Sequence, residues 1–73
     1  MRTAQRKAIL DALNEGPVST FLARDYLGIP HPAGRIKELR ESGCQIRTFK
    51  TWELDANGIK HLVAKYALVG GEA

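Results

Sequence analysis

The sequence predicts an α+β domain in which three helices are followed by a β-hairpin. Three successive segments repeat apolar residues at the three-and-four spacing of a buried helix face, and glycine or proline separates them. Two later segments alternate apolar and polar residues on either side of an Asn57-Gly58 turn, which is typical of a hairpin. The 73 residues, 44% of them hydrophobic and 26% charged, suit one small folded domain over residues 1–73.

The first helix is expected over residues 3–14, where apolar side chains recur at helical spacing and Thr3 can cap the start. Gly16 and Pro17 follow it directly. Glycine readily adopts the left-handed conformation of a helix cap, and proline cannot continue a helix. We therefore expect the first helix to end just before this pair.

The second and third helices are expected over residues 20–27 and 32–42, joined by a turn that contains Gly28 and Pro30. Pro32 suits the first turn of the third helix, because its missing N–H costs no intrahelical bond and its fixed φ favours the start. Two short helices joined by a glycine-containing turn form the helix-turn-helix pattern. The third helix is then the one that reads DNA in proteins of this pattern.

The third helix is predicted to have two different sides. At about 100° per residue, Pro32, Ile36 and Leu39 share one side, which we expect to be buried. The side that points away from them is expected to carry Gly34, Lys37, Glu38 and Glu41. Glu38 has two open interpretations: it accepts a hydrogen bond from a cytosine amine, or it pairs with a nearby cation.

The hairpin is expected over residues 44–69, with a short strand at Val18 as a third partner and a frayed tail at 70–73. Cys44 and Ile46 begin the first strand with their side chains on one face. The second strand is expected to place four side chains on one face: Leu62, Ala64, Tyr66 and Leu68. The remaining apolar residues of the hairpin carry more apolar surface than one small sheet covers, which indicates a homodimer.

Charge favours a polyanionic partner. Eleven basic and eight acidic side chains give a formal charge of +3. The basic residues gather at the start of the chain, on the third helix and in the hairpin. Each cluster has a plain alternative, since charged side chains also keep a surface solvated.

Nine residues are candidates for DNA contact, because residues near the start of a recognition helix reach base edges and further cations hold phosphate. On the third helix and just before it they are His31, Ala33, Gly34, Arg35, Lys37 and Arg40, and elsewhere Arg6, Lys50 and Lys60. Arg35 pairs with guanine through its fork or holds phosphate, and the sequence leaves both roles open. Gly34 weakens a helix but lets the backbone approach a ligand closely.

The stretch HPAGRIKELRESG, followed by a hairpin and the strand residues Lys65 to Leu68, resembles the winged helix-turn-helix family. It is most similar to small stand-alone helix-turn-helix proteins of proteobacteria and their prophages. More distantly, the segment from Leu27 to Ile46 resembles the DNA-binding domain of the biotin repressor. The resemblance implies a recognition helix in the major groove and a hairpin that acts as a wing.

Other function classes find little support. The chain has one cysteine, so it forms no internal disulfide, and we expect no metal site, no cofactor and no small-molecule ligand. No apolar run reaches the roughly 18 residues of a membrane span, and we expect a cytoplasmic protein without enzymatic activity. The prediction is sequence-specific binding of double-stranded DNA by a small transcriptional regulator that forms a homodimer. The alternatives are an excisionase-like or architectural DNA-bending factor, and a winged helix that binds only other proteins.

Overall fold

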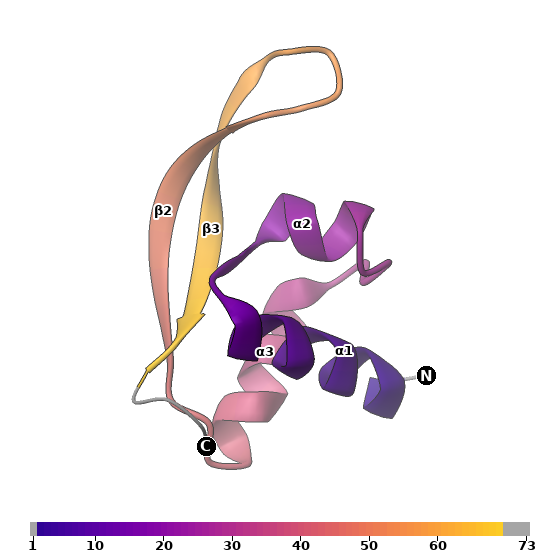
Figure 1. Cartoon of the computed structure of the whole chain (residues 1–73), viewed down its shortest axis with the longest axis vertical. Coiled ribbons are helices and arrows are strands. Elements are labelled where there is room, and N and C mark those ends of the chain that lie inside the picture. The colour runs from indigo at the N-terminus through magenta and orange to yellow at the C-terminus, as the bar shows by residue number, and fades with distance from the viewer. Residues whose placement is uncertain (1, 70–73) are drawn as a thin grey trace.

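Three helices and a three-stranded sheet make up the computed structural model, which describes residues 2–69, with side chains from residue 4 onward. The predicted tail at 70–73 lies outside these residues. In chain order the elements are α1 (Arg2–Glu15), β1 (Val18–Ser19), α2 (Thr20–Asp25), α3 (Pro32–Glu41), β2 (Ile46–Leu54) and β3 (Lys60–Leu68) (Figure 1). The predicted order of three helices and a hairpin is confirmed. α1 begins at Arg2, one residue before the predicted start, and the cap predicted for the Thr3 side chain falls outside the described side chains.

The sheet is antiparallel, with the strand order β1-β3-β2. Val18 pairs with Tyr66, so the short third strand expected at Val18 is confirmed. β2 and β3 pair without interruption from Ile46 opposite Leu68 to Leu54 opposite Lys60. Because β3 lies in the middle, the outer edge of β2 pairs with no other described strand.

Hydrogen bonds fix both the start of α2 and the turn that connects it to α3. Ser19 caps α2, its Oγ accepting a hydrogen bond from the backbone N–H of Leu22 at 3.0 Å. After α2, which ends at Asp25 and is shorter than predicted, Gly28 adopts a φ of 68° that few other residues tolerate. Ile29 then enters the core fully buried, and its N–H donates to Ala23 O at 3.0 Å. This anchor sets the direction in which α3 leaves the turn.

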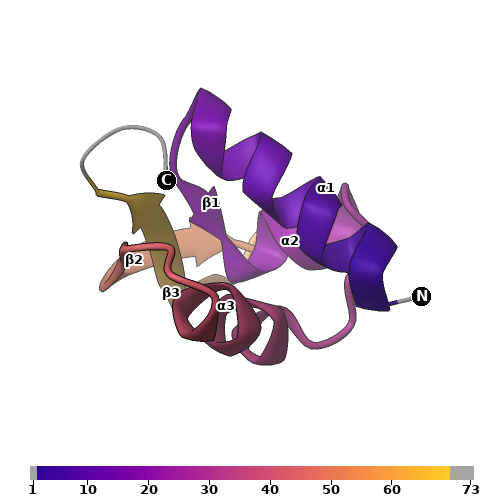
Figure 2. The ribbon, with the colours of Figure 1, turned by 90° about the horizontal axis from the view of Figure 1, so that it is seen from below.

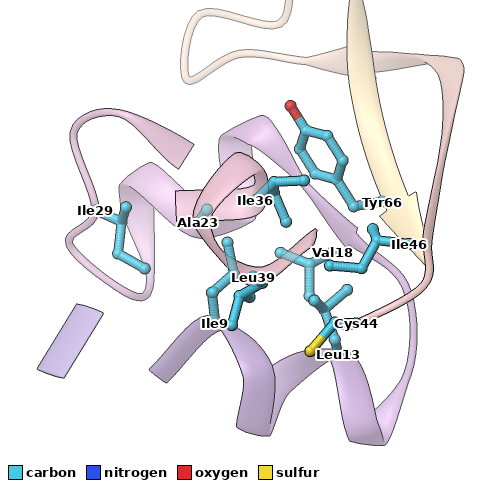
Figure 3. Close-up of a cluster of buried hydrophobic side chains, with 10 residues drawn as sticks. All are labelled: Ile9, Leu13, Val18, Ala23, Ile29, Ile36, Leu39, Cys44, Ile46 and Tyr66. Atoms are coloured by element: carbon cyan, nitrogen blue, oxygen red, sulfur yellow. The ribbon is translucent and has the colours of Figure 1, made fainter. Parts of the chain in front are cut away.

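The core lies between α1, α3 and the lower half of the hairpin (Figure 3). Its ten members come from every helix and strand and from the turns between them: Ile9, Leu13, Val18, Ala23, Ile29, Ile36, Leu39, Cys44, Ile46 and Tyr66. The buried side of α3 predicted from its spacing is confirmed, since Pro32, Ile36 and Leu39 are all buried. Seen from below, α1 and α3 lie on opposite sides of α2 and β1, and the lower end of the hairpin lies to one side of them (Figure 2).

The upper half of the hairpin extends beyond this core and past α2 (Figure 1). The face predicted for β3 is therefore only partly buried: Tyr66 is 6% exposed, but Leu62 is 51% exposed. Trp52 and Leu54 on β2 are exposed as well. A chain of this length buries a small core, and the long hairpin reaches past its limit.

Candidate nucleic-acid interface

The solvent-facing side of α3 is the first component of the candidate interface. Opposite the buried residues lie Ala33, Lys37, Arg40 and Glu41, all exposed, and we call these four the outer face of α3. No other described residue pairs with the Lys37 ammonium group. His31 precedes the helix as its N-cap residue, exposed and without a side-chain capping bond. The outer face therefore presents, near a helix start, a cation that no described residue pairs with.

Arg35 takes a different direction, although it is only two residues from Lys37. Its side chain is 14% exposed, and its Nη2 donates to Glu38 Oε2 at 3.1 Å. Its Nη1 donates to Gln5 Oε1 of α1 at 3.3 Å. Its Nε lies 3.1 Å from Glu38 Oε1 without hydrogen-bond geometry. The guanidinium of Arg35 is thus held against α1 and not aimed outward.

Glu38 joins the same group from the other side. Its Oε1 also accepts from Arg6 Nη1 at 3.4 Å, and its side chain is only 22% exposed. The prediction that Glu38 points away from the buried side is therefore wrong, because two arginines draw its carboxylate toward α1. Of the two interpretations given for Glu38, the structure supports pairing with a cation. We call Gln5, Arg6, Arg35 and Glu38 the α1–α3 clamp.

Arg40 connects α3 to the hairpin. Its Nε and Nη2 donate to Ile46 O at 3.1 and 2.7 Å, and Nη2 also donates to Thr48 Oγ1 at 2.7 Å. Such charge-assisted bonds are stronger than neutral ones. These bonds fix the position of the first residues of β2 relative to the end of α3. Arg40 remains exposed, so its charge still faces solvent.

The hairpin supplies the second component. Side chains two residues apart on a strand share a face. The face that begins with buried Ile46 and Tyr66 continues toward the tip with Lys50 and Lys60, both exposed. We call it the core-side face, and on β2 it comprises Ile46, Thr48, Lys50, Trp52 and Leu54. Arg40 of α3 bonds to Thr48 on this face, so the core-side face is continuous with α3 as far as Lys50.

The tip of the hairpin is ordered by Asp55. Its Oδ1 accepts from the N–H groups of Asn57 and Ile59, both at 2.9 Å, and its Oδ2 lies 2.8 Å from His61 Nε2. The bond from Ile59, then the contact with His61, lowers the pKa of the Asp55 carboxyl below its usual 3.8. His61 lies on the face opposite Lys60 and stacks edge-on against Phe21 of α2, with ring centroids 5.7 Å apart. His61 therefore belongs to the hairpin tip and does not share the face of the candidate cation Lys60.

Gly34 has no structural reason to be glycine within the described chain. It lies in α3 with a helical φ, and a Cβ built on it would meet no heavy atom within 4 Å. Glycine costs a helix up to about 1 kcal/mol relative to alanine. A reason for glycine at this position would therefore have to come from a molecule that binds the chain.

The nine candidates thus divide into two groups. The N-cap residue of α3, the outer face of α3 and the core-side face of the hairpin contribute six exposed residues: His31, Ala33, Lys37, Arg40, Lys50 and Lys60. Arg6 and Arg35 belong to the α1–α3 clamp, and Gly34 is half-buried. Sequence reasoning missed Gln5 and Thr48 as the partners that direct Arg35 and Arg40. The three-residue spacing of Arg35 and Glu38 was a usable signal for their pairing.

The sequence model of the winged helix-turn-helix domain matches residues 4–71, which is nearly the whole chain. The chain belongs to the winged helix-turn-helix family. In this winged helix, α2 and α3 form the helix-turn-helix and β2 and β3 form the wing. Membership in the family suggests DNA binding, and such domains are typically non-enzymatic. No curated protein and no solved structure matched the chain.

No helix among residues 2–69 is long and apolar enough to cross a membrane. Within the same residues, no group of three or more His, Cys, Asp or Glu side chains is arranged to hold a metal ion. Cys44 is a free, buried thiol at the edge of the core.

Proposed function

We propose that this winged helix binds double-stranded DNA sequence-specifically as a small transcriptional regulator, with α3 in the major groove and the hairpin along the backbone. The observation that carries the proposal is the continuity between the outer face of α3 and the core-side face of the hairpin. Lys37 lies on the first, Lys50 and Lys60 lie on the second, and the Arg40–Thr48 bond joins them. Cations along such a surface supply the salt-dependent attraction to phosphate.

The geometry supports different roles for the candidates. His31, Ala33 and Lys37 lie on or beside the first turns of α3, from which a recognition helix reaches base edges. In the proposed complex, Arg40, Lys50 and Lys60 lie along the DNA backbone and contact its phosphates. Arg35 and Arg6 act indirectly in this proposal, since the clamp fixes the angle between α3 and α1.

We further propose that the protein acts as a homodimer on a two-part site. One small domain contacts only a few base pairs, and two copies double the contacted sequence. Similarity to small stand-alone regulators of proteobacteria and prophages remains part of this proposal, and rests on the stretch from His31 to Gly43.

Selection of bound duplexes from a random DNA pool tests the proposal. We expect an enriched inverted repeat, and affinity for it that falls linearly with the logarithm of salt concentration. Enrichment of bent fragments without a shared sequence would favour an architectural role, which a bending assay on the selected DNA would measure. If no duplex were bound at low salt, the proposal would be wrong.

A protein-binding module is the second candidate, and the exposed apolar residues of the hairpin favour it. Trp52, Leu54 and Leu62 are 63%, 61% and 51% exposed. Apolar patches of this kind often mark protein interfaces. Absence of DNA binding together with a stable protein complex through the hairpin would support this candidate.

A further inference from the structure

The free edge of β2 is the most distinctive surface that DNA binding does not explain. β2 is nine residues long, contains no proline and, among the described strands, pairs with β3 alone. In Figure 1 it forms the margin of the molecule opposite α1 and α2. An exposed edge strand presents a row of unpaired N–H and C=O groups that can pair with another strand. Natural proteins commonly shorten, bend or cover such edges. The edge of β2 is long, and the pairing of β2 with β3 continues without interruption along it.

The backbone hydrogen bonds show which residues of β2 face outward. Gln45 O accepts from Val69 N at 2.8 Å, and Ile59 O accepts from Asp55 N at 3.0 Å. Hydrogen-bonded and non-hydrogen-bonded pairs alternate along an antiparallel ladder. The odd-numbered residues of β2 therefore bond to β3, and the even-numbered ones direct their N–H and C=O groups outward. The bonds from Arg40 to Ile46 O agree, because that carbonyl points away from β3.

Arg40 occupies the outward carbonyl at one end of this edge and leaves the rest open. The remaining outward groups belong to four residues: Thr48, Lys50, Trp52 and Leu54. All four are exposed, and the midpoint of the four is Thr51. A second β2 strand running antiparallel and centred on Thr51 would satisfy every one of these groups. Each of the four residues would donate one hydrogen bond and accept one.

We propose that two copies of this chain dimerise by pairing their β2 strands antiparallel about a two-fold axis at Thr51. In this register Lys50 lies opposite Trp52 of the second copy, and Thr48 lies opposite Leu54. A lysine beside an indole ring gains a cation–π contact, and both apolar side chains lose exposed surface. The interface deepens the homodimer of the proposed function and rests on it, but it does not rest on the DNA contacts.

Moving the two-fold axis from Thr51 to a neighbouring residue gives a less favourable pairing. Centring the pair on Lys50 places two lysines directly opposite each other, and like charges at that position destabilise a sheet. Centring on Phe49 requires the Ile46 carbonyl, which Arg40 already holds. Centring on Trp52 leaves the outward groups of Thr48 without partners. Thr51 is the centre that avoids all three costs.

The proposed dimer has a consequence for the recognition helices. A two-fold axis perpendicular to the sheet keeps the core-side faces of both copies on the same side. Because α3 packs against that face through Ile36, Ile46 and Tyr66, both α3 helices lie on one side of the joined sheet. Two-fold arrangement of recognition helices on one side is what an inverted repeat requires.

Cysteine cross-linking tests the register in the full chain. In a Cys44→Ala background, Thr51→Cys, Lys50→Cys and Phe49→Cys are compared under mild oxidation. We expect Thr51→Cys to form a covalent dimer at least about tenfold faster than the other two, since cysteines whose Cα atoms are more than about 7 Å apart cannot be bridged. Faster cross-linking through Lys50→Cys or Phe49→Cys would overturn the register.

Sedimentation across the micromolar range tests the interface itself. Lys50→Pro removes an outward N–H while proline remains tolerated on an edge strand, and Lys50→Gln is its charge-matched control. We expect the native chain to sediment at twice the 8.1 kDa monomer mass. Lys50→Gln should dimerise about tenfold more weakly, because it loses the cation–π contact but keeps its backbone hydrogen bonds, and Lys50→Pro about 100-fold more weakly. A native chain that stays monomeric, or a Lys50→Pro variant that dimerises normally, would contradict the proposal. Lys50→Gln and Lys50→Pro both lose the proposed phosphate contact and differ in the outward N–H, so failure of DNA binding and failure of dimerisation are read separately.

Discussion

The two sides of α3 carry similar residues in very different surroundings. On the side toward α1, Arg35 is 14% exposed and bound to Glu38 and Gln5. On the outer face, Lys37 is exposed and pairs with no other described residue. The comparison teaches that a cation in a recognition helix is available to DNA only if the fold leaves it unpaired. We expect changes on the inner side to alter stability, and changes on the outer face to alter binding.

The largest effect is expected in the buried layer of α3. Ile36 is 1% exposed, and Ile36→Ala should lower the free energy of unfolding by about 2–5 kcal/mol through lost burial and the cavity left behind. Chemical denaturation monitored by circular dichroism measures the change. Lys37→Ala, the adjacent outer-face control, should stay within about 0.5 kcal/mol of the native chain. Equal destabilisation by both variants would remove the distinction between the two sides.

A smaller effect is expected in the α1–α3 clamp. Arg35→Gln and Glu38→Gln should each destabilise the fold by about 1 kcal/mol, because both side chains are mostly buried but still reach solvent. A double-mutant cycle measures their coupling, which we expect to be about 0.5–1 kcal/mol. Additive single effects would show that Arg35 and Glu38 act independently. Arg35 would then regain a direct role at DNA.

Gly34 separates stability from binding at one position. Gly34→Ala should stabilise the fold by about 0.5–1 kcal/mol, since alanine favours a helix and its Cβ meets no heavy atom within 4 Å. Gly34→Leu should fold but bind the selected DNA more weakly, because its side chain holds the helix backbone away from the groove. Thermal unfolding and duplex titration measure the two effects. A Gly34→Leu variant that binds as tightly as the native chain would refute close approach as the reason for glycine.

The smallest effect is expected at the hairpin tip. The native pKa of Asp55 lies below 3.8, so its carboxylate stabilises the folded tip above that pH, and the contribution disappears as pH falls through the native pKa. His61→Gln should raise the pKa of Asp55 only part of the way, because the bond from Ile59, which is the larger cause of the lowering, remains. Carboxyl chemical shifts titrated by NMR measure this, with Lys60→Gln as a control at a neighbouring cation. An Asp55 pKa that does not respond to His61→Gln would contradict the assigned contact.

Sequence periodicity predicted the elements well because it depends on burial. Ile36 and Leu39 repeat at helical spacing, and Asn57-Gly58 marks the turn, so α3 and the hairpin could be anticipated. The predicted end of α2 was two residues too late and the predicted start of α1 one residue too late, since local signals at helix ends are weak.

The direction of individual charged side chains could not be predicted in the same way. Arg35 and Arg40 flank the buried side of α3 in sequence, but their partners Gln5 and Thr48 are 30 and 8 residues away. Only the packing of α1 and β2 against α3 brings those partners into reach. Composition likewise indicated a homodimer but not an interface, because the free edge of β2 depends on the strand order.

The most direct test of the central claim compares two single-charge changes in duplex binding. Lys37→Ala removes an unpaired cation from the outer face of α3, and Arg47→Ala removes an exposed one from the hairpin face opposite Lys50. Titration of the selected duplex at several salt concentrations should show Lys37→Ala weaker by about 1–3 kcal/mol and Arg47→Ala nearly unchanged. Equal affinities for Lys37→Ala and the native chain, or a larger loss in Arg47→Ala, would contradict recognition of DNA by the outer face of α3.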